Sequence, residues 1–252
     1  MSEEQVGPLA GKVALVTGGS RGLGREMVLA FADAGADVVI ASRKIDNCRD
    51  VAALVEAKGR HALPVGFHVG HWDEVDGLVE QAYGAFGHVD VLVNNAGMSP
   101  LYPELTAVTE ELWDKVFAVN LKGPFRLTAL VGTRMAAGAG GSIINVSTTG
   151  SLRPAPDMLP YDAAKSGLNT LTEGFAKAFG PSVRVNCIMA GPFLTDIAEN
   201  SWGPAVREHG LPRHALGRAG EPPEIVGAAL YFATDASSFT TGAILRVDGG
   251  IP

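Results

Sequence analysis

The sequence predicts a doubly wound α/β fold, with a seven-stranded parallel sheet and helices on both faces. Short β-branched runs alternate with longer helical stretches along the chain, and strands separated by helices pair in parallel through right-handed crossovers. The short runs are continuously apolar, as expected for strands that helices cover on both sides. No Pro-, Gly- or Ser-rich linker and no internal repeat divides the chain, so residues 1–252 are expected to form a single domain.

Seven short runs are expected to be the strands. In chain order they are Lys12–Thr17, Asp37–Ala41, 62–67, Val89–Val93, Ser142–Ser147, Val183–Ile188 and Ala243–Val247. Stretches with helical spacing of apolar residues lie between them. The expected helices are Gly22–Asp33, Asn47–Lys58, Asp73–Phe86, 110–135 with an interruption near Gly123-Pro124, 161–179 and Pro223–Ala233.

One long stretch, at about 191–221, has no clean pattern of either kind. A long irregular segment in a compact domain usually has a functional role. This stretch is therefore predicted to be a lid over the substrate.

Composition and charge exclude several classes of protein. The net charge is −7 and no block of like charge occurs, which argues against a nucleic-acid partner because phosphate binding needs clustered Lys and Arg. No apolar run approaches the length of about 18 residues that indicates a membrane span, and the N-terminus, MSEEQVGPLAGK, lacks the features of a signal peptide. The two cysteines, Cys48 and Cys187, are expected to be reduced thiols. A soluble, cytoplasmic protein with no metal site is expected.

A glycine-rich turn follows the first predicted strand and opens the first helix. Glycines at such a turn let the backbone touch a pyrophosphate, which then rests on the helix N-terminus. The residues predicted to contact the cofactor here are Gly18, Ser20, Arg21, Gly22, Leu23 and Gly24.

The end of the second strand indicates which dinucleotide binds. NAD enzymes commonly carry an acid there to accept from the ribose 2′-hydroxyl, but this chain has Ser42 and Arg43 and no carboxylate. Both side chains, together with Arg21, could bind a 2′-phosphate through charge-assisted hydrogen bonds. NADP(H) is therefore the expected cofactor.

The spacing of the glycine turn resembles that of the short-chain dehydrogenase/reductase family, and three further motifs follow in the family's order over nearly the whole chain. They are Asn94-Asn95-Ala96-Gly97, Tyr161-Asp162-Ala163-Ala164-Lys165 and Val247-Asp248-Gly249-Gly250. The resemblance implies a Rossmann-like oxidoreductase that transfers a hydride to a ketone or from a secondary alcohol, and that assembles as a homotetramer or homodimer.

The resemblance also implies roles for individual residues. Asn95, Ala96 and Gly97 should border the cofactor, while Gly191, the Phe193 backbone and Thr195 should hold its carboxamide, although Ala190 stands where the family commonly has Pro. His68 and Val69 should border the adenine, with His68 where the family often has Asp. Asn120 should anchor a water beside Lys165.

Tyr161 and Lys165 lie four residues apart on a predicted helix and so project from one face. A phenol of ordinary pKa, about 10, is a poor base at neutral pH. We expect the nearby ammonium to lower the Tyr161 pKa, and the resemblance implies that Tyr161 is the acid/base while Lys165 also holds the nicotinamide ribose.

A third catalytic hydroxyl is expected at the end of the fifth strand, where it would polarise the substrate oxygen. Family spacing favours Thr148. Ser147 is the residue type that the family usually has in this role, but it lies one position earlier in the chain than the spacing indicates. Neighbours in a strand face opposite sides, so the two are not expected to share the role.

The substrate itself is left open by the sequence. Residues near the lid and before Tyr161 mix apolar side chains with basic ones, including Arg153, which suits a partly apolar ketone or alcohol with or without an acid group. A 3-oxoacyl thioester, a sugar acid and a xenobiotic ketone are alternatives, and a catalytically silent NADP-binding sensor or scaffold is the alternative to an enzyme. The helix pairing expected in the assembly would use apolar residues of two helices, namely Leu127, Leu130, Leu168, Leu171 and Phe175.

Overall fold

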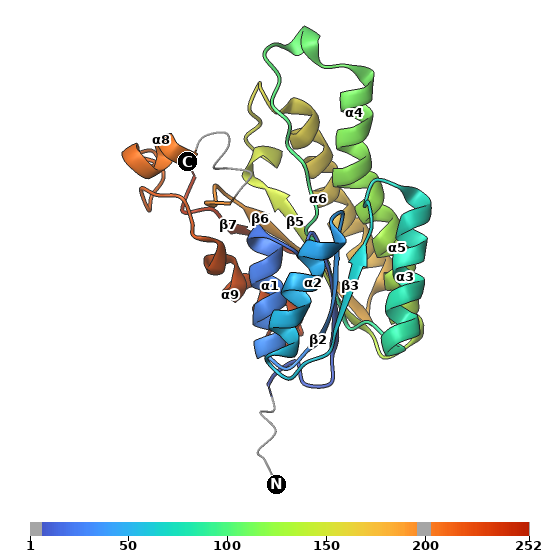
Figure 1. Cartoon of the computed structure of the whole chain (residues 1–252). Helices are drawn as coiled ribbons and strands as arrows, with labels where there is room; N and C mark the ends of the chain where they lie inside the picture. Colours follow the sequence, from blue (N-terminus) through green and yellow to red (C-terminus); the bar gives the residue numbers. More distant parts are fainter. Residues whose placement is uncertain (1–6, 196–202, 252) are drawn as a thin grey trace.

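Seven strands form one parallel sheet in the order β3-β2-β1-β4-β5-β6-β7 in the computed structural model, which describes residues 7–195 and 203–251 (Figure 1). The strand order reverses between β1 and β4, and in such sheets the crevice outside the carboxyl ends of the strands binds ligands. The strands are β1 Val13–Thr17, β2 Asp37–Ser42, β3 Ala62–Gly66, β4 Val91–Asn94, β5 Gly141–Thr148, β6 Val183–Ala190 and β7 Ile244–Val247. The doubly wound fold expected from the sequence is confirmed.

Helices cover both faces of the sheet (Figure 1). One buried cluster joins the sheet to α1 Gly22–Asp33, α2 Ile45–Glu56 and α9 Val226–Ala233. The other joins it to α3 Trp72–Phe86, α5 Gly123–Ala137 and α6 Leu159–Phe179, and α4 Glu110–Phe117 packs beside α6. The remaining helical segments are η1 Leu105–Ala107, η2 Ala118–Lys122, η3 Thr149–Ser151, α8 Gly203–His209, η4 Pro222–Ile225 and η5 Asp235–Ser237. None of the helices in the described part of the chain is long and apolar enough to cross a membrane.

The interruption expected near Gly123-Pro124 is a wide turn and not a break. Residues Ala118–Lys122 form a single π-helical turn between α4 and α5, in which the Gly123 N–H donates to the Ala118 carbonyl. Pro124 has no N–H to give to the carbonyl of Asn120 four residues earlier. The chain therefore keeps its helical direction while the ladder is opened at Asn120.

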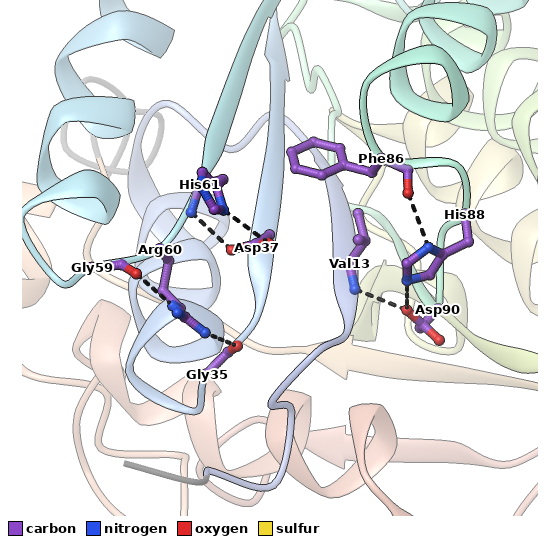
Figure 2. Close-up of polar contacts among 9 residues, drawn as sticks. All are labelled: Val13, Gly35, Asp37, Gly59, Arg60, His61, Phe86, His88 and Asp90. Atoms are coloured by element: carbon purple, nitrogen blue, oxygen red, sulfur yellow. Dashed lines mark hydrogen bonds and ion pairs between the residues drawn. The ribbon is translucent and has the colours of Figure 1, made fainter. Parts of the chain in front are cut away.

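The amino edge of the sheet is held by two carboxylates, each of which links two strands (Figure 2). Asp90, just before β4, accepts from the Val13 N–H of β1 at 2.9 Å and lies 3.2 Å from Nε2 of His88. Asp37 opens β2 and accepts from the His61 N–H, which precedes β3, at 2.8 Å. These contacts fix the register at the end of the sheet opposite the crevice.

The stretch predicted to be a lid is described only in part, because residues 196–202 lie outside the described ranges. After α8 the chain turns back on itself, and the turn is tied to the C-terminal glycines. Ala215 N donates to Gly250 O at 3.1 Å and Leu216 N donates to Gly249 O at 3.0 Å. This turn is thus fixed against the loop after β7.

Candidate active site

A cavity of about 750 Å³ lies at the carboxyl ends of the strands, where the crossover between β1 and β4 leaves a crevice. All of the sequence-predicted site residues line it except Gly24 and Asn120. Those two lie just behind the lining. The cavity has a nucleotide end at the glycine turn and a chemical end at Tyr161.

Two glycines of the turn after β1 are required by its geometry. Gly22 has φ +52°, a left-handed conformation that side chains rarely adopt. At Gly24, a Cβ atom would collide with the carbonyl of Gly18 and the amide of Asn95. Within the described residues, no side chain caps the start of α1 and no acid lies in its first turn, so its N–H groups and positive dipole suit an anion.

Thr17 and Asn95 hold the turn against the end of β4. The Thr17 hydroxyl accepts from the N–H groups of Asn95 and Ala96, both at 3.1 Å. The Asn95 side chain donates to Thr17 O at 3.0 Å and Gly18 O at 3.2 Å. The Asn95 amide therefore holds the backbone of the glycine turn in place.

The polar groups expected to meet a 2′-phosphate lie together at the end of β2. The Ser20 and Ser42 hydroxyls are 2.8 Å apart, which joins the glycine turn to β2. Arg21 and Arg43 are exposed side chains on the lining of the same end of the cavity.

His68 lines the cavity after β3 and stacks on His71, with the two ring centroids 4.2 Å apart. Its backbone N–H donates to Glu74 at 2.6 Å. Partial burial, followed by the charges of His71 and Arg43, lowers the pKa of His68. A neutral, stacked ring presents a flat face and not the acceptor that a carboxylate would supply.

Asn120 sits in the π-helical turn with its side chain fully satisfied. Its amide donates to the carbonyls of Met98 and Val116, both at 2.9 Å, and its Oδ1 accepts from the Met98 N–H at 3.2 Å. The side chain therefore ties the chain after β4 to the turn. Because Pro124 cannot donate, the Asn120 backbone carbonyl is the group released from the helix ladder.

Burial dominates the chemistry of Tyr161 and Lys165. The Lys165 ammonium donates to the Val146 carbonyl at 2.7 Å and lies 5.9 Å from the centre of the Tyr161 ring. Burial raises the pKa of Tyr161 to about 12, and the charge of Asp162 adds to the effect. Burial lowers the pKa of Lys165 to about 8.

The expectation that Lys165 lowers the Tyr161 pKa was therefore wrong. Loss of water around the phenol outweighs the distant ammonium. At neutral pH Tyr161 keeps its proton, so the side chain is set to act as an acid.

The two candidate hydroxyls at the end of β5 have different partners. Thr148 shares a side-chain hydrogen bond with Tyr161 and accepts from the Gly150 N–H at 3.3 Å. Ser147 is buried and donates to the Lys165 carbonyl at 3.3 Å. The Thr148 hydroxyl is thus hydrogen-bonded to the Tyr161 phenol, whereas the Ser147 hydroxyl is hydrogen-bonded to the backbone of α6.

Sequence reasoning missed Asp162, which follows Tyr161 on α6 and is 2% exposed. Its Oδ2 accepts from the Ala155 N–H at 2.9 Å, which holds the loop between β5 and α6. Its Oδ1 is buried with no partner among the described residues, and burial raises the pKa of this carboxyl. An acid inside the Tyr-x-x-x-Lys motif was the only sequence signal.

The end of β6 approaches the glycine turn from the other side. A Cβ on Gly22 would lie 3.4 Å from Cγ2 of Thr195, and Phe193 pairs with Gly220 in an isolated bridge. The Gly191 N–H donates to Val247 O at 2.9 Å, so the turn is held although Ala190 replaces the family's proline.

Comparisons with known proteins agree with this geometry. A family model described as Enoyl-(Acyl carrier protein) reductase matches residues 18–252. Dehydrogenase/reductase SDR family member 4 from Homo sapiens is 34% identical over 247 residues, 97% of this chain and 89% of the relative. The 3-oxoacyl-(acyl-carrier-protein) reductase FabG of Thermotoga maritima is 36% identical over 244 residues, 96% of this chain and 98% of the relative. A blue fluorescent protein from a metagenomic library, solved in complex with NADPH, matches with a TM-score of 0.89 at 32% identity, covering 96% of this chain and 98% of that one.

Proposed function

The chain belongs to the short-chain dehydrogenase/reductase family, and from that premise we propose that it is an NADP(H)-dependent oxidoreductase acting on a ketone or secondary alcohol. The observation that carries the proposal is that Thr148, Tyr161 and Lys165 line one end of a cavity whose other end is the glycine turn. A protein that only senses or carries the cofactor has no need of a buried phenol beside a buried ammonium.

The residues present fit a dinucleotide. Gly22 and Gly24 leave room where side chains would project, and the start of α1 is open to an anion. In this proposal the pyrophosphate rests on the turn from Gly18 to Leu23, the adenine lies against His68 and Val69, and Thr195 and the Phe193 backbone hold the carboxamide. The nicotinamide supplies or accepts the hydride when it is bound.

Each catalytic residue then has one task. Tyr161 holds the proton that the substrate oxygen takes up on reduction, and Thr148, hydrogen-bonded to Tyr161, orients that oxygen. Lys165 binds the ribose and adds positive charge, and the Asn120 carbonyl anchors a water beside it.

We also propose that residues 191–221 close over the substrate. Val206, Leu211 and His214, which belong to this segment, line the cavity. The tie between the 215–216 backbone and the C-terminal glycines gives the segment a fixed base from which to cover the site.

The choice of NADP(H) is tested by titration and turnover. A panel of ketones should be reduced with loss of NADPH absorbance, and NADPH should be preferred over NADH by about 30- to 1000-fold, the sum of several partly exposed charge-assisted bonds. Arg43→Ala should weaken the binding of NADPH and leave the binding of NADH unchanged. Arg49→Ala is the matched control, because Arg49 is exposed on α2, the helix that follows Arg43, and pairs with Asp46 at 2.8 Å.

Equal binding of NADH and NADPH by the unmutated protein would overturn the cofactor assignment. Tight NADPH binding without turnover of any ketone or alcohol would instead favour the silent sensor.

We propose that the chain assembles as a homotetramer or homodimer. The residues first expected to pair need correction, since Leu127 and Leu168 are buried in the chain's own core. Exposed apolar side chains lie elsewhere on these helices and on β7, among them Trp113, Phe125 and Leu245. A light-scattering mass of one subunit, 26.1 kDa, would contradict the proposal.

The cytoplasm is the proposed compartment. Cys48 and Cys187 are buried free thiols, which fits a reducing environment. Fractionation of the cells that express the protein would test this placement.

A further inference from the structure

Two loops that are far apart in the sequence form part of the cavity wall at its chemical end. The first follows β4 and contributes Met98, Ser99 and Leu101 to the lining. The second joins η3 to α6 and contributes Met158, which lies three residues before Tyr161. Apart from the Ser99 hydroxyl these four side chains are apolar, so this part of the wall suits an apolar group.

One hydroxyl joins the two loops. Tyr102, in the first loop, is only 9% exposed. Its hydroxyl donates to the Pro156 carbonyl at 2.7 Å and accepts from the Leu159 N–H at 3.0 Å. We call these two hydrogen bonds the Tyr102 clasp. Both polar functions of the phenol are thus used to hold the second loop and the residue at which α6 begins.

The Leu159 N–H needs an acceptor from outside its helix. The first N–H groups of a helix have no partner within it, and the ladder of α6 starts with the Asp162 N–H, which donates to Met158 O at 3.0 Å. The side chain at the N-cap, Met158, makes no capping hydrogen bond. Tyr102 therefore caps α6 from another loop, two residues before Tyr161.

The clasp also determines how far apart two lining side chains lie. Leu101 directly precedes Tyr102, and Met158 directly precedes Leu159, so each lining residue is next to a residue of the clasp. Ser99 adds a second tie between the loops, since its hydroxyl donates to Sδ of Met158 at 3.3 Å. The spacing of Leu101 and Met158 is thus fixed by contacts that lie behind the cavity wall.

We propose that Tyr102 is a positioning residue that determines which ketones the site accepts, because it fixes Leu101 and Met158 against the carbon chain of the substrate. The proposal rests on the proposed oxidoreductase function and adds to it a residue that sets specificity. Tyr102 itself is outside the cavity lining, so it contacts no reactant and moves no proton. The group that it selects is apolar, as leucine and thioether side chains favour.

The test uses a series of straight-chain methyl ketones of increasing length. For the unmutated protein, kcat/KM should reach a maximum at one length. Tyr102→Phe keeps the ring and removes both hydrogen bonds, so kcat/KM at that maximum should fall by about tenfold, mainly through KM. Longer ketones should lose less, which flattens the profile.

Tyr231→Phe is the matched control. Its hydroxyl lies 2.9 Å from Oγ1 of Thr240, and the side chain is exposed and outside the cavity lining. Loss of this hydroxyl should leave the length profile as it is.

Leu101→Ala tests the same wall with the clasp intact. The change removes a lining side chain and leaves the Tyr102 hydroxyl in place, so the maximum should move to longer ketones. This result does not depend on how well the Tyr102→Phe protein folds, and a maximum that stays at the same length would overturn the proposal.

Hydrogen exchange gives a readout that needs no turnover. In Tyr102→Phe the Leu159 N–H loses its acceptor, so amide exchange over residues 155–160, measured by mass spectrometry, should be faster by about tenfold or more at that amide. Tyr231→Phe should exchange in this segment like the unmutated protein.

Unchanged exchange in Tyr102→Phe would overturn the Tyr102 clasp. A uniform loss of kcat/KM at every ketone length would overturn the role in specificity and leave the proposed function intact. If the unmutated protein reduced no ketone, but calorimetry showed that NADPH-loaded Tyr102→Phe binds the ketones more weakly, the proposed function would fall and the role of Tyr102 would stand.

Discussion

At the amino edge of the sheet, Asp90 accepts from the Val13 N–H and pairs with Lys12 and His88, whereas at the carboxyl edge Asp162 keeps one buried oxygen without a partner among the described residues. The same contrast extends to other groups. At the carboxyl edge, burial raises the pKa of Tyr161 and lowers the pKa of Lys165.

The two edges of the sheet therefore use ionisable groups for different purposes. Satisfied carboxylates at the amino edge fix strand register, and they stay in contact with water. Tyr161 and Lys165 at the carboxyl edge have pKa values shifted by burial, an arrangement typical of sites that transfer protons. Changes at the carboxyl edge should therefore affect turnover, and changes at the amino edge should affect folding.

The largest expected effect is that of Tyr161→Phe. The change keeps the ring and removes the proton that the substrate oxygen needs, so kcat should fall by about 10²- to 10⁴-fold. NADPH binding should survive nearly unchanged, which a fluorescence titration would show. Turnover equal to that of the unmutated protein would remove Tyr161 from the mechanism.

Thr148→Val comes next and separates the two neighbouring hydroxyls. Loss of the group that is hydrogen-bonded to Tyr161 should lower kcat by about 10²-fold. Ser147→Ala is the matched change, and we expect it to be milder because Ser147 bonds to the Lys165 carbonyl. Steady-state kinetics on one ketone would compare them, and the reverse ranking would give the role to Ser147.

The pH dependence of reduction should report Lys165. The ammonium is the active form, so activity is present below its lowered pKa and is lost as the pH rises through about 8. Tyr161 keeps its proton over this range, since its pKa is about 12. We expect kcat/KM to fall by about tenfold per pH unit above this point.

Lys165→Arg is the control for that profile, because a guanidinium stays charged. Its activity should be lower but should not decline in the same pH range. A flat profile up to about pH 10 in the unmutated enzyme would show that Lys165 does not titrate there.

The smallest effect on turnover is expected at the amino edge. Asp90→Ala leaves the Val13 N–H without its acceptor and should lower the free energy of unfolding by about 1–3 kcal/mol. Asp90→Asn keeps an oxygen acceptor and should lose less. Urea denaturation would measure both, and a fall in kcat of the folded Asp90→Ala protein would break the contrast between the two edges.

Periodicity and turn residues were enough to predict the fold. The order of strands and helices is as expected, and most boundaries shift by only one to three residues, as where α6 begins at Leu159 and β6 continues to Ala190. Pro160 occupies the first turn of α6, where a missing N–H does no harm. The strand extends because the ladder with β7 continues to the pair Ala190–Val247.

The chemistry of the site was less accessible from sequence. Motif spacing brought Tyr161, Lys165 and Thr148 to one cavity, but the pKa of Tyr161 depends on burial that only three-dimensional packing defines. The Tyr102 clasp and the buried carboxylate of Asp162 also arise from tertiary contacts between segments without a shared motif. Residues held by local backbone geometry were thus predictable, and residues defined by their surroundings were not.

The π-helical turn at Ala118–Lys122 ties the position of Asn120 to the phase of a whole helix. A turn with one extra residue rotates everything after it by about 100° relative to a regular helix. That rotation directs Leu127 and Val131 of α5 into the core beneath the sheet. Deleting one residue here would restore regular α-helical turns up to Pro124 and at the same time point those side chains at solvent, so the π-helical turn cannot be lost without repacking α5.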